Sequence, residues 1–190
     1  MKNVVVYLTG PPGVGKYSVG SVLAQQIPAR LVDNHYWNNP IFELIEPDGK
    51  TPLPDSVWGL ADKVRSAVLE TIATLAPPER SFVFTHAVSH DGGHPLDRRI
   101  AEQILNAAKR RGADTLVVRL SCNETVLEQR IESPARTARL KERDGSRAAH
   151  YVSLVPFIPQ HDWVMELDTT NLTPTETADT ILKTLRSGIT

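Results

Sequence analysis

The chain has 190 residues, with 21 lysines and arginines against 22 aspartates and glutamates, so its formal net charge is −1. This balance argues against the broad positive surface of a protein that binds duplex nucleic acid. The length fits a single domain, residues 1–190. One cysteine, Cys122, cannot form an internal disulfide, and no apolar run reaches the length of a signal-peptide core or a membrane span. We therefore expect a cytoplasmic protein with no nucleic-acid or membrane partner, and the oligomeric state stays open.

Short apolar runs rich in β-branched residues recur along the chain and predict five strands, at residues 4–9, 29–32, 81–85, 115–120 and 163–167. Several of these runs are almost continuously apolar, which is typical of strands covered on both faces. Helical patterns lie between them. The sequence therefore predicts an α/β fold, with a five-stranded parallel sheet and helices on both faces.

The helices are marked by apolar residues at a spacing of 3.6. One such pattern begins at Val57, and another runs from Leu96 to Ala107. The second ends in Lys109-Arg110-Arg111-Gly112. Cations in the last turn and a glycine directly after it are typical of the C-terminal end of a helix. Two capping-box spacings predict the starts of the last two helices: Ser121-x-x-Glu124 and Thr173-x-x-Glu176.

A glycine loop separates the first strand from the first helix, and its sequence is Gly10-Pro11-Pro12-Gly13-Val14-Gly15-Lys16-Tyr17-Ser18. Strand, G-x-x-x-x-G-K and helix in this order form the P-loop, or Walker A, motif. Glycines let backbone N–H groups converge on phosphate oxygens, and the helix turns its positive end toward the anion. We expect all nine residues to bind ATP, with Lys16 at the β- and γ-phosphates. The alternative is a glycine turn that merely joins a buried strand to a helix.

The residue after the P-loop lysine departs from the motif. It is usually serine or threonine, whose hydroxyl holds Mg²⁺, and here it is Tyr17. A rigid phenol cannot place its oxygen where that hydroxyl would lie. We therefore expect Mg²⁺ to be held by the phosphates and water, with Asp33 in the outer shell.

Asp33, Asn34 and His35 follow the second predicted strand. An acid at this sheet end can organise Mg²⁺ through water or accept a proton from an attacking hydroxyl. Alternatively, Asp33 only caps the following helix, and His35 either contacts substrate or lies at the rim. No acid follows the other long apolar strands, and the guanine-reading Asn-Lys-x-Asp is missing, which argues against motor ATPases and GTPase switches.

Two stretches interrupt the alternation of strands and helices, residues 34–54 and 132–148. Long segments at the ligand-binding end of a sheet are often functional, so we expect a substrate-side insertion and a lid. Arg130, Arg136 and Arg139 lie at or in the second stretch. Arginines suit the charge that develops in phosphoryl transfer. The alternative is a pair of plain surface loops.

Two residues near this sheet end, Trp37 and His86, are candidate substrate contacts. Ordinary packing is the alternative for the tryptophan, and a polar loop is the alternative for the histidine. His86 also belongs to a group with His90, Asp91 and His94. A metal site in this group is disfavoured, because Gly92-Gly93 interrupts any helix that would align its members.

Taken together, these motifs resemble the small P-loop kinases, the branch that holds shikimate kinase, gluconate kinase, chloramphenicol phosphotransferase and the nucleoside monophosphate kinases. They are most similar to bacterial AAA-domain ATP-binding proteins of that branch. The resemblance implies a nucleoside-monophosphate-kinase-like fold with a lid. It also implies that Lys16, Asp33, Arg130 and Arg136 do the chemistry, and that the loop 168–173, including Thr170, lies near the adenine.

The acceptor sites of two relatives in this branch do not match the chain. The shikimate kinase pattern has a second acid after the second strand, where this chain has Asp33-Asn34-His35. Residues 34–54 contain no arginine that could hold a nucleotide acceptor. The sequence thus predicts an ATP- and Mg²⁺-dependent kinase that phosphorylates a hydroxyl of a small, neutral or weakly charged metabolite or antibiotic. The alternative is a nucleotide-binding sensor or pseudokinase without transfer activity.

Overall fold

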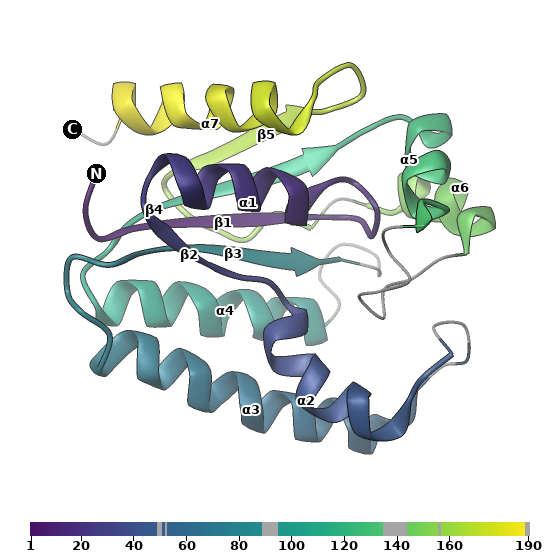
Figure 1. Ribbon diagram of the computed structural model, residues 1–190, viewed down its shortest axis with the longest axis horizontal. Helices are drawn as coiled ribbons and strands as arrows, with labels where there is room; N and C mark the ends of the chain where they lie inside the picture. Colours follow the sequence, from purple (N-terminus) through teal and green to yellow (C-terminus); the bar gives the residue numbers. More distant parts are fainter. Residues whose placement is uncertain (49–50, 52, 89–94, 135–143, 156, 189–190) are drawn as a thin grey trace.

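A parallel five-stranded sheet forms the centre of the molecule (Figure 1). The structure is a computed structural model that describes residues 1–48, 51, 53–88, 95–134, 144–155 and 157–188. The strand order is β2-β3-β1-β4-β5, and every neighbouring pair is parallel. The strands are β1 (Val4–Gly10), β2 (Ala29–Val32), β3 (Ser81–Ala87), β4 (Asp114–Ser121) and β5 (Val164–Asp168). The predicted fold class is therefore confirmed.

Helices cover both faces of this sheet. In Figure 1, α1 and α7 lie on one face, whereas α3 and α4 lie on the other. A short 3₁₀ turn, Gly145–Arg147, precedes α6. The α-helices of the described residues are α1 (Lys16–Gln26), α2 (His35–Ile45), α3 (Asp55–Thr74), α4 (Pro95–Arg110), α5 (Glu124–Ile131), α6 (Ala148–Ser153) and α7 (Pro174–Gly188).

The central strand β1 is buried along its whole length because both its faces are covered. Val6 and Leu8 pack with the core under α1 and α7, and Val5 and Tyr7 pack with the core under α3 and α4. Burying one such side chain contributes about 1.5–3 kcal/mol of stability. The strand is therefore held firmly, and so is the start of the loop that leaves its carboxyl end at Gly10.

Local hydrogen bonds set the helix starts, and they confirm one of the two predicted capping boxes. At α7, Thr173 N–H donates to the Glu176 carboxylate at 2.8 Å, and Glu176 N–H donates to the Thr173 hydroxyl at 3.2 Å. The prediction for α5 was wrong. Its cap is Asn123, whose side-chain oxygen accepts from Val126 N–H at 2.9 Å, whereas Ser121 ends strand β4.

The segment 34–54 holds a helix, α2, in addition to irregular chain. Pro40 lies inside this helix and removes one backbone donor, a pattern that usually argues against a helix. Two aromatic side chains on the helix, Trp37 and Phe42, are buried to 1 % and 5 % exposure, and α2 packs against α3. Tertiary packing thus stabilises a helix that local sequence does not predict.

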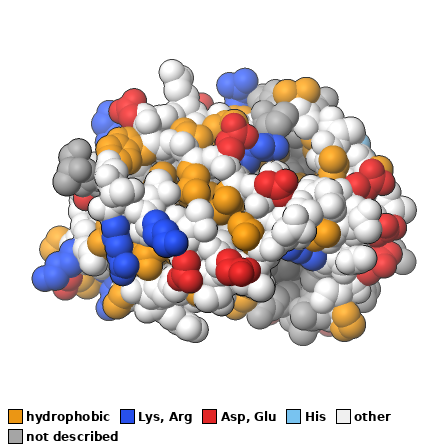
Figure 2. Space-filling view, turned by 90° about the horizontal axis from the view of Figure 1, so that it is seen from above, with side chains coloured by type: hydrophobic (Ala, Val, Ile, Leu, Met, Phe, Trp, Pro, Cys, Tyr) orange, Lys and Arg blue, Asp and Glu red, His pale blue; other side chains and the backbone are white. Residues whose placement is uncertain are grey.

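The surface over α1 and α7 carries charges of both signs. Figure 2, which views the molecule from this side, shows Lys and Arg side chains interspersed with Asp and Glu. Among the described residues, none of the helices has the length and apolar character needed to cross a membrane.

Candidate active site

One cavity of about 750 Å³ opens at the carboxyl ends of the strands. Ligands bind at this edge in open α/β sheets. The P-loop residues 12–18 form one part of its wall, and the ends of β2 and β3 with α2 and α3 form another. The end of α5 and the loop from β5 to α7 complete it. A single cavity therefore joins the predicted phosphate loop to the predicted acceptor side.

The P-loop glycines have distinct physical roles. Gly15, the residue before α1, has φ +107°, and a Cβ added there would meet no atom within 4 Å. This position needs a residue that tolerates a left-handed backbone. Gly10 has φ +136°, and a Cβ there would lie 2.3 Å from the Leu120 carbonyl oxygen. Gly10 therefore lets the loop start against strand β4.

Lys16 lies folded into the loop, with a side chain that is only 7 % exposed. Its Nζ donates to the carbonyl oxygens of Gly10 and Pro11, both at 2.7 Å. The ammonium group is thus already inside the ring of backbone groups that the motif provides for phosphate oxygens. This arrangement fits a nucleotide phosphate, for which the amine supplies a point charge.

Tyr17 and Ser18 also line the cavity. The Tyr17 carbonyl accepts a hydrogen bond from the Ser21 hydroxyl at 2.8 Å, within the first turns of α1. Ser18 is exposed. The residue that follows the P-loop lysine thus presents a phenol to the site instead of a small hydroxyl.

Asp33 is held in place at the end of β2 and is 9 % exposed. Its Oδ2 accepts from the Thr85 hydroxyl at 2.9 Å, and its Oδ1 accepts from His35 N–H at 3.0 Å. The bond to His35 N–H ties Asp33 to the first residue of α2, and Asp33 also lines the cavity. The geometry is therefore compatible with both roles that the sequence left open.

His35 and Asn34 lie beside this carboxylate on the cavity wall. The His35 Nδ1 is 3.1 Å from Asp33 Oδ1 and 3.0 Å from Asn34 Oδ1. Because Nδ1 faces two oxygens, these contacts favour a proton on Nδ1. Both residues were predicted to bind substrate; both line the cavity, and that role stays a prediction.

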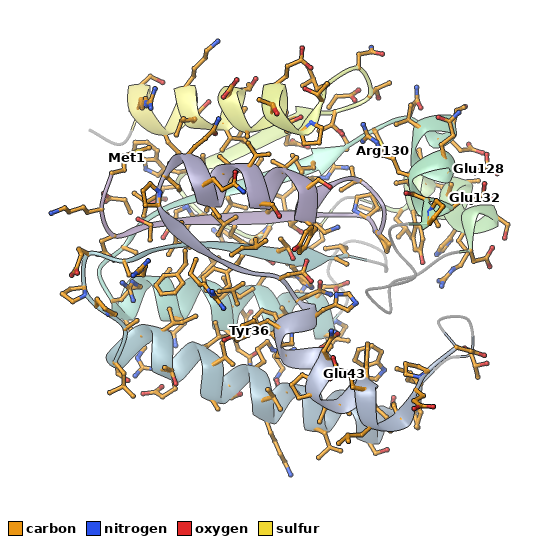
Figure 3. All side chains as sticks on the ribbon, viewed as in Figure 1. Met1, Tyr36, Glu43, Glu128, Arg130 and Glu132 are labelled. Carbon is orange, nitrogen blue, oxygen red and sulfur yellow. The ribbon has the colours of Figure 1, made fainter. Side chains whose placement is uncertain are left out.

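Arg130 connects three parts of the site (Figure 3). From α5 its guanidinium donates to the Val14 carbonyl at 3.2 Å, to the Thr169 hydroxyl at 2.9 Å and to the Thr169 carbonyl at 2.9 Å. The P-loop and the β5–α7 loop are thereby tied to one side chain. Its predicted catalytic role stays a prediction, and its structural role is visible in these bonds.

Replacing Arg130 with methionine, which keeps an apolar stem, removes three partly exposed hydrogen bonds from a charged donor. A net loss of about 2 kcal/mol should lower the melting temperature of a chain of this length by about 4–8 °C. Arg119→Met is the matched control. Arg119 pairs with Glu166 at 2.7 Å, and that carboxylate is 56 % exposed. Loss of a surface ion pair of this kind should lower the melting temperature by less than about 2 °C. Equal thermal shifts for the two variants would contradict the connecting role of Arg130.

The β5–α7 loop contributes Thr169 to the cavity, not the predicted Thr170. The Thr170 hydroxyl accepts from Asn123 N–H at 3.0 Å, and the Thr170 N–H donates to Asp168 at 2.7 Å. Hydrogen bonds from the Thr170 hydroxyl and from the Thr170 N–H, with a smaller contribution from Arg130, hold the pKa of Asp168 below its usual range. The sequence contains no signal that separates the two adjacent threonines.

The structure contradicts the assignment of His86 to the substrate side. Along β3, Thr85 and Ala87 face the cavity, so His86 faces the α3/α4 side and is 2 % exposed. Its Nδ1 lies 2.6 Å from the Tyr7 hydroxyl, and its Nε2 lies 3.3 Å from Asp97 Oδ1. Burial lowers the pKa of His86 and raises that of Tyr7.

The structure also contradicts the predicted substrate contact of Trp37 and agrees with the alternative, ordinary packing. Its side chain is buried in the core under α3 and α4, with the Arg65 guanidinium 6.0 Å from the ring. Asn38 and Phe42 of α2, with Trp58 of α3, line the cavity instead. Asn34, Asn38 and Phe42 are spaced by four residues, which puts them on one face of a helix. This four-residue spacing could have identified the lining residues from the sequence only if α2 had first been recognised as a helix.

Several predicted residues lie outside the described residues. Arg136 and Arg139 of the predicted lid are among them, and so are His90, Asp91 and His94. Among the residues that the structure does describe, no group of three or more His, Cys, Asp or Glu side chains could hold a metal ion. Asp33 has carboxylate oxygens in the cavity wall, and its predicted contact with Mg²⁺ through water stays a prediction.

Comparison with known proteins found no matching family model and no matching curated protein. Solved structures do match in fold. A gluconokinase from Sinorhizobium meliloti has 18 % identity and a TM-score of 0.64, with 97 % of this chain and 92 % of that one covered. A sugar kinase from a Janibacter species has 13 % identity and a TM-score of 0.64, with 98 % and 96 % covered.

A third match is the adenylylsulfate (APS) kinase of Mycobacterium tuberculosis, solved with AMPPNP and APS. Its identity to this chain is 16 % and the TM-score is 0.57, and 98 % of this chain and 99 % of that one are covered. At these identities the similarity establishes the fold. The chain has the fold of the small P-loop kinases, as the resemblance of its motifs implied.

Proposed function

We propose that the protein is an ATP-dependent phosphotransferase that acts on a hydroxyl group of a small molecule. The observation that carries this proposal is the single cavity that contains both the P-loop with Lys16 and the carboxylate of Asp33. One end of the cavity offers backbone amides and a cation, as phosphates require. The other offers a fixed acid that can accept a proton from an alcohol. The kinase folds of the matching structures support this reading.

ATP supplies the phosphoryl group and Mg²⁺ offsets its charge when both are bound. The P-loop amides and Lys16 bind and orient the phosphates. Asp33 takes the proton from the acceptor hydroxyl as that oxygen bonds to the γ-phosphorus. The bond from the γ-phosphorus to the β,γ-bridging oxygen breaks at the same time, and ADP leaves. Arg130 holds the P-loop against the β5–α7 loop. Leu172 of that loop and Thr177 of α7 line the cavity and would meet the nucleoside.

ATP consumption with a set of candidate acceptors tests the proposal directly. We expect little turnover without an acceptor, and a strong increase with one or a few members of a panel of nucleosides, sugars, antibiotics and shikimate. The increase should be absent in Lys16→Ala. ATP binding that no member of the panel converts into turnover would contradict transfer activity and favour the second candidate, a non-catalytic nucleotide sensor. Tyr17 in the cavity wall is the observation that favours this candidate.

The response to Mg²⁺ depends on Tyr17. We expect ATP binding by the natural chain to depend weakly on Mg²⁺, because Tyr17 cannot supply the usual hydroxyl ligand. Tyr17→Thr should strengthen that dependence by creating the ligand, and Tyr17→Val, of similar size to threonine, is the matched control without a hydroxyl. Calorimetric titration of ATP at low and high Mg²⁺ measures the effect. Steep Mg²⁺ dependence in the natural chain, unchanged by Tyr17→Thr, would show that another group holds the metal.

A further inference from the structure

Three aromatic side chains form a continuous wall on the acceptor side of the cavity. His35 and Phe42 of α2 meet edge to face, with ring centroids 6.3 Å apart and planes at 80°. Phe42 meets Trp58 of α3 in the same way, at 5.9 Å and 78°. All three rings line the cavity. Their mutual packing holds them in one arrangement, and we call this set the aromatic wall.

Trp58 is the exposed member of the aromatic wall. Phe42 is 5 % exposed, whereas Trp58 is 37 % exposed and lies within the first turn of α3. A large, partly exposed aromatic ring in a cavity wall is a ready surface for a ligand ring, because stacked or edge-on aromatic contacts are stabilising. Trp58 is thus the part of the wall that an acceptor would cover.

The polar end of the acceptor side lies next to the aromatic wall. His35 belongs to the wall and also approaches Asp33 Oδ1, at 3.1 Å. The amide side chain of Asn38 lines the same region and can donate or accept a hydrogen bond. An acceptor whose ring lies on Trp58 and Phe42 therefore has its polar groups near Asn38 and the carboxylate.

The charges in the cavity disfavour an anionic acceptor. Among the described lining residues the two Lys or Arg side chains are Lys16 and Arg130, and their hydrogen bonds hold both on the nucleotide side. The acid on the acceptor side is Asp33. Two like charges about 4 Å apart repel by about 4 kcal/mol near a protein surface. A carboxylate or phosphate close to Asp33 would meet that repulsion.

We propose that the acceptor subsite takes a neutral alcohol that carries an apolar ring. The ring lies against Trp58 and Phe42, and the hydroxyl reaches Asp33. This inference rests on the proposed function and narrows its substrate class. Sugars without an apolar group, carboxylated alcohols and phosphorylated acceptors should bind this subsite more weakly.

Three matched compounds test the subsite. The first is 3-phenylpropane-1,2-diol, the second is propane-1,2-diol, which lacks the ring, and the third is 3-phenyllactate, which has a carboxylate in place of the terminal alcohol. Binding is measured by ligand-observed NMR on the full chain saturated with ADP. We expect the phenyl diol to bind about tenfold or more tightly than either of the others, since ring burial and the absence of charge each favour it.

Variants of Trp58 identify the surface that binds the ring. Trp58→Ala should weaken binding of the phenyl diol by about tenfold, and Trp58→Phe, which keeps a ring, should retain most of it. Leu60→Ala is the matched control, since Leu60 is on the same helix, is 47 % exposed and is not part of the cavity wall. ADP affinity, measured on each variant, reports that the fold is intact.

The possible results separate the subsite from the proposed function. Equal binding of all three compounds, no binding of the phenyl diol, or no effect of Trp58→Ala overturns the subsite. Stimulation of ATP consumption by an anionic or ring-free alcohol alone would overturn it too, while transfer activity would stand. Selective binding of the phenyl diol, with no turnover for any ring-bearing alcohol, would keep the subsite and contradict the proposed function.

Discussion

Asp33→Asn is expected to reduce acceptor-dependent ATP turnover by about a hundredfold or more, the usual scale for losing a positioned acid or base. The asparagine keeps one oxygen, which can accept from His35 N–H, and its amide nitrogen can donate to the Thr85 hydroxyl in place of Oδ2, so the structure of the site should survive. ATP affinity should change little, because the carboxylate faces the acceptor side. Turnover measured at saturating ATP and calorimetric titration of ATP separate the two quantities.

Two further variants control this experiment. Asp179→Asn changes an exposed aspartate on α7 whose Oδ1 accepts from Gln26 at 2.7 Å, and it should leave turnover unchanged. Thr85→Val removes the hydroxyl that donates to Asp33 and should lower turnover partially, whereas Thr85→Ser should restore it. Near-normal turnover in Asp33→Asn would leave Asp33 with a structural role, through its bonds with His35 and Thr85.

Lys16→Ala is expected to abolish turnover and to weaken ATP binding by about tenfold to a hundredfold, because a charge-assisted contact to phosphate contributes about 1.5–3 kcal/mol. Lys16→Met keeps most of the apolar stem and should show the same loss, which assigns the effect to the ammonium group. Lys183→Ala, at an exposed position on α7, is the matched control. Calorimetry and the thermal shift induced by ATP report binding without relying on turnover.

The outcome for Lys16 tests the P-loop itself. In the structure its Nζ bonds the carbonyls of Gly10 and Pro11, so removal also changes the free loop. The melting temperature without nucleotide shows how large that change is. ATP affinity equal to that of the natural chain, in a variant that melts normally, would show that the loop does not bind nucleotide phosphates in the proposed way.

Sequence alone determined the features that depend on neighbouring residues. The glycine loop between β1 and α1 was recognised because its backbone demands and its lysine lie within nine residues. The cap of α7 was recognised because Thr173 and Glu176 bond each other across one turn. The positions of the central strands β1, β3 and β4 followed from apolar runs, because a strand buried on both faces has no polar side to present. These signals were sufficient for the sheet, for the helices that cover its two faces and for the glycine loop in the cavity wall.

The tertiary structure decided the acceptor side, since distant contacts set it. Helix α2 forms despite Pro40 because Trp37 and Phe42 are buried, and only a helix puts Asn38 and Phe42 in the cavity while Trp37 faces the core. On strand β3, Thr85 points toward Asp33 and His86 points away from it, because the face of the strand that carries His86 packs on α3 and α4. The partners of Arg130 are also remote, at Val14 and Thr169. Local sequence cannot specify such choices, because each depends on which surface a distant element covers.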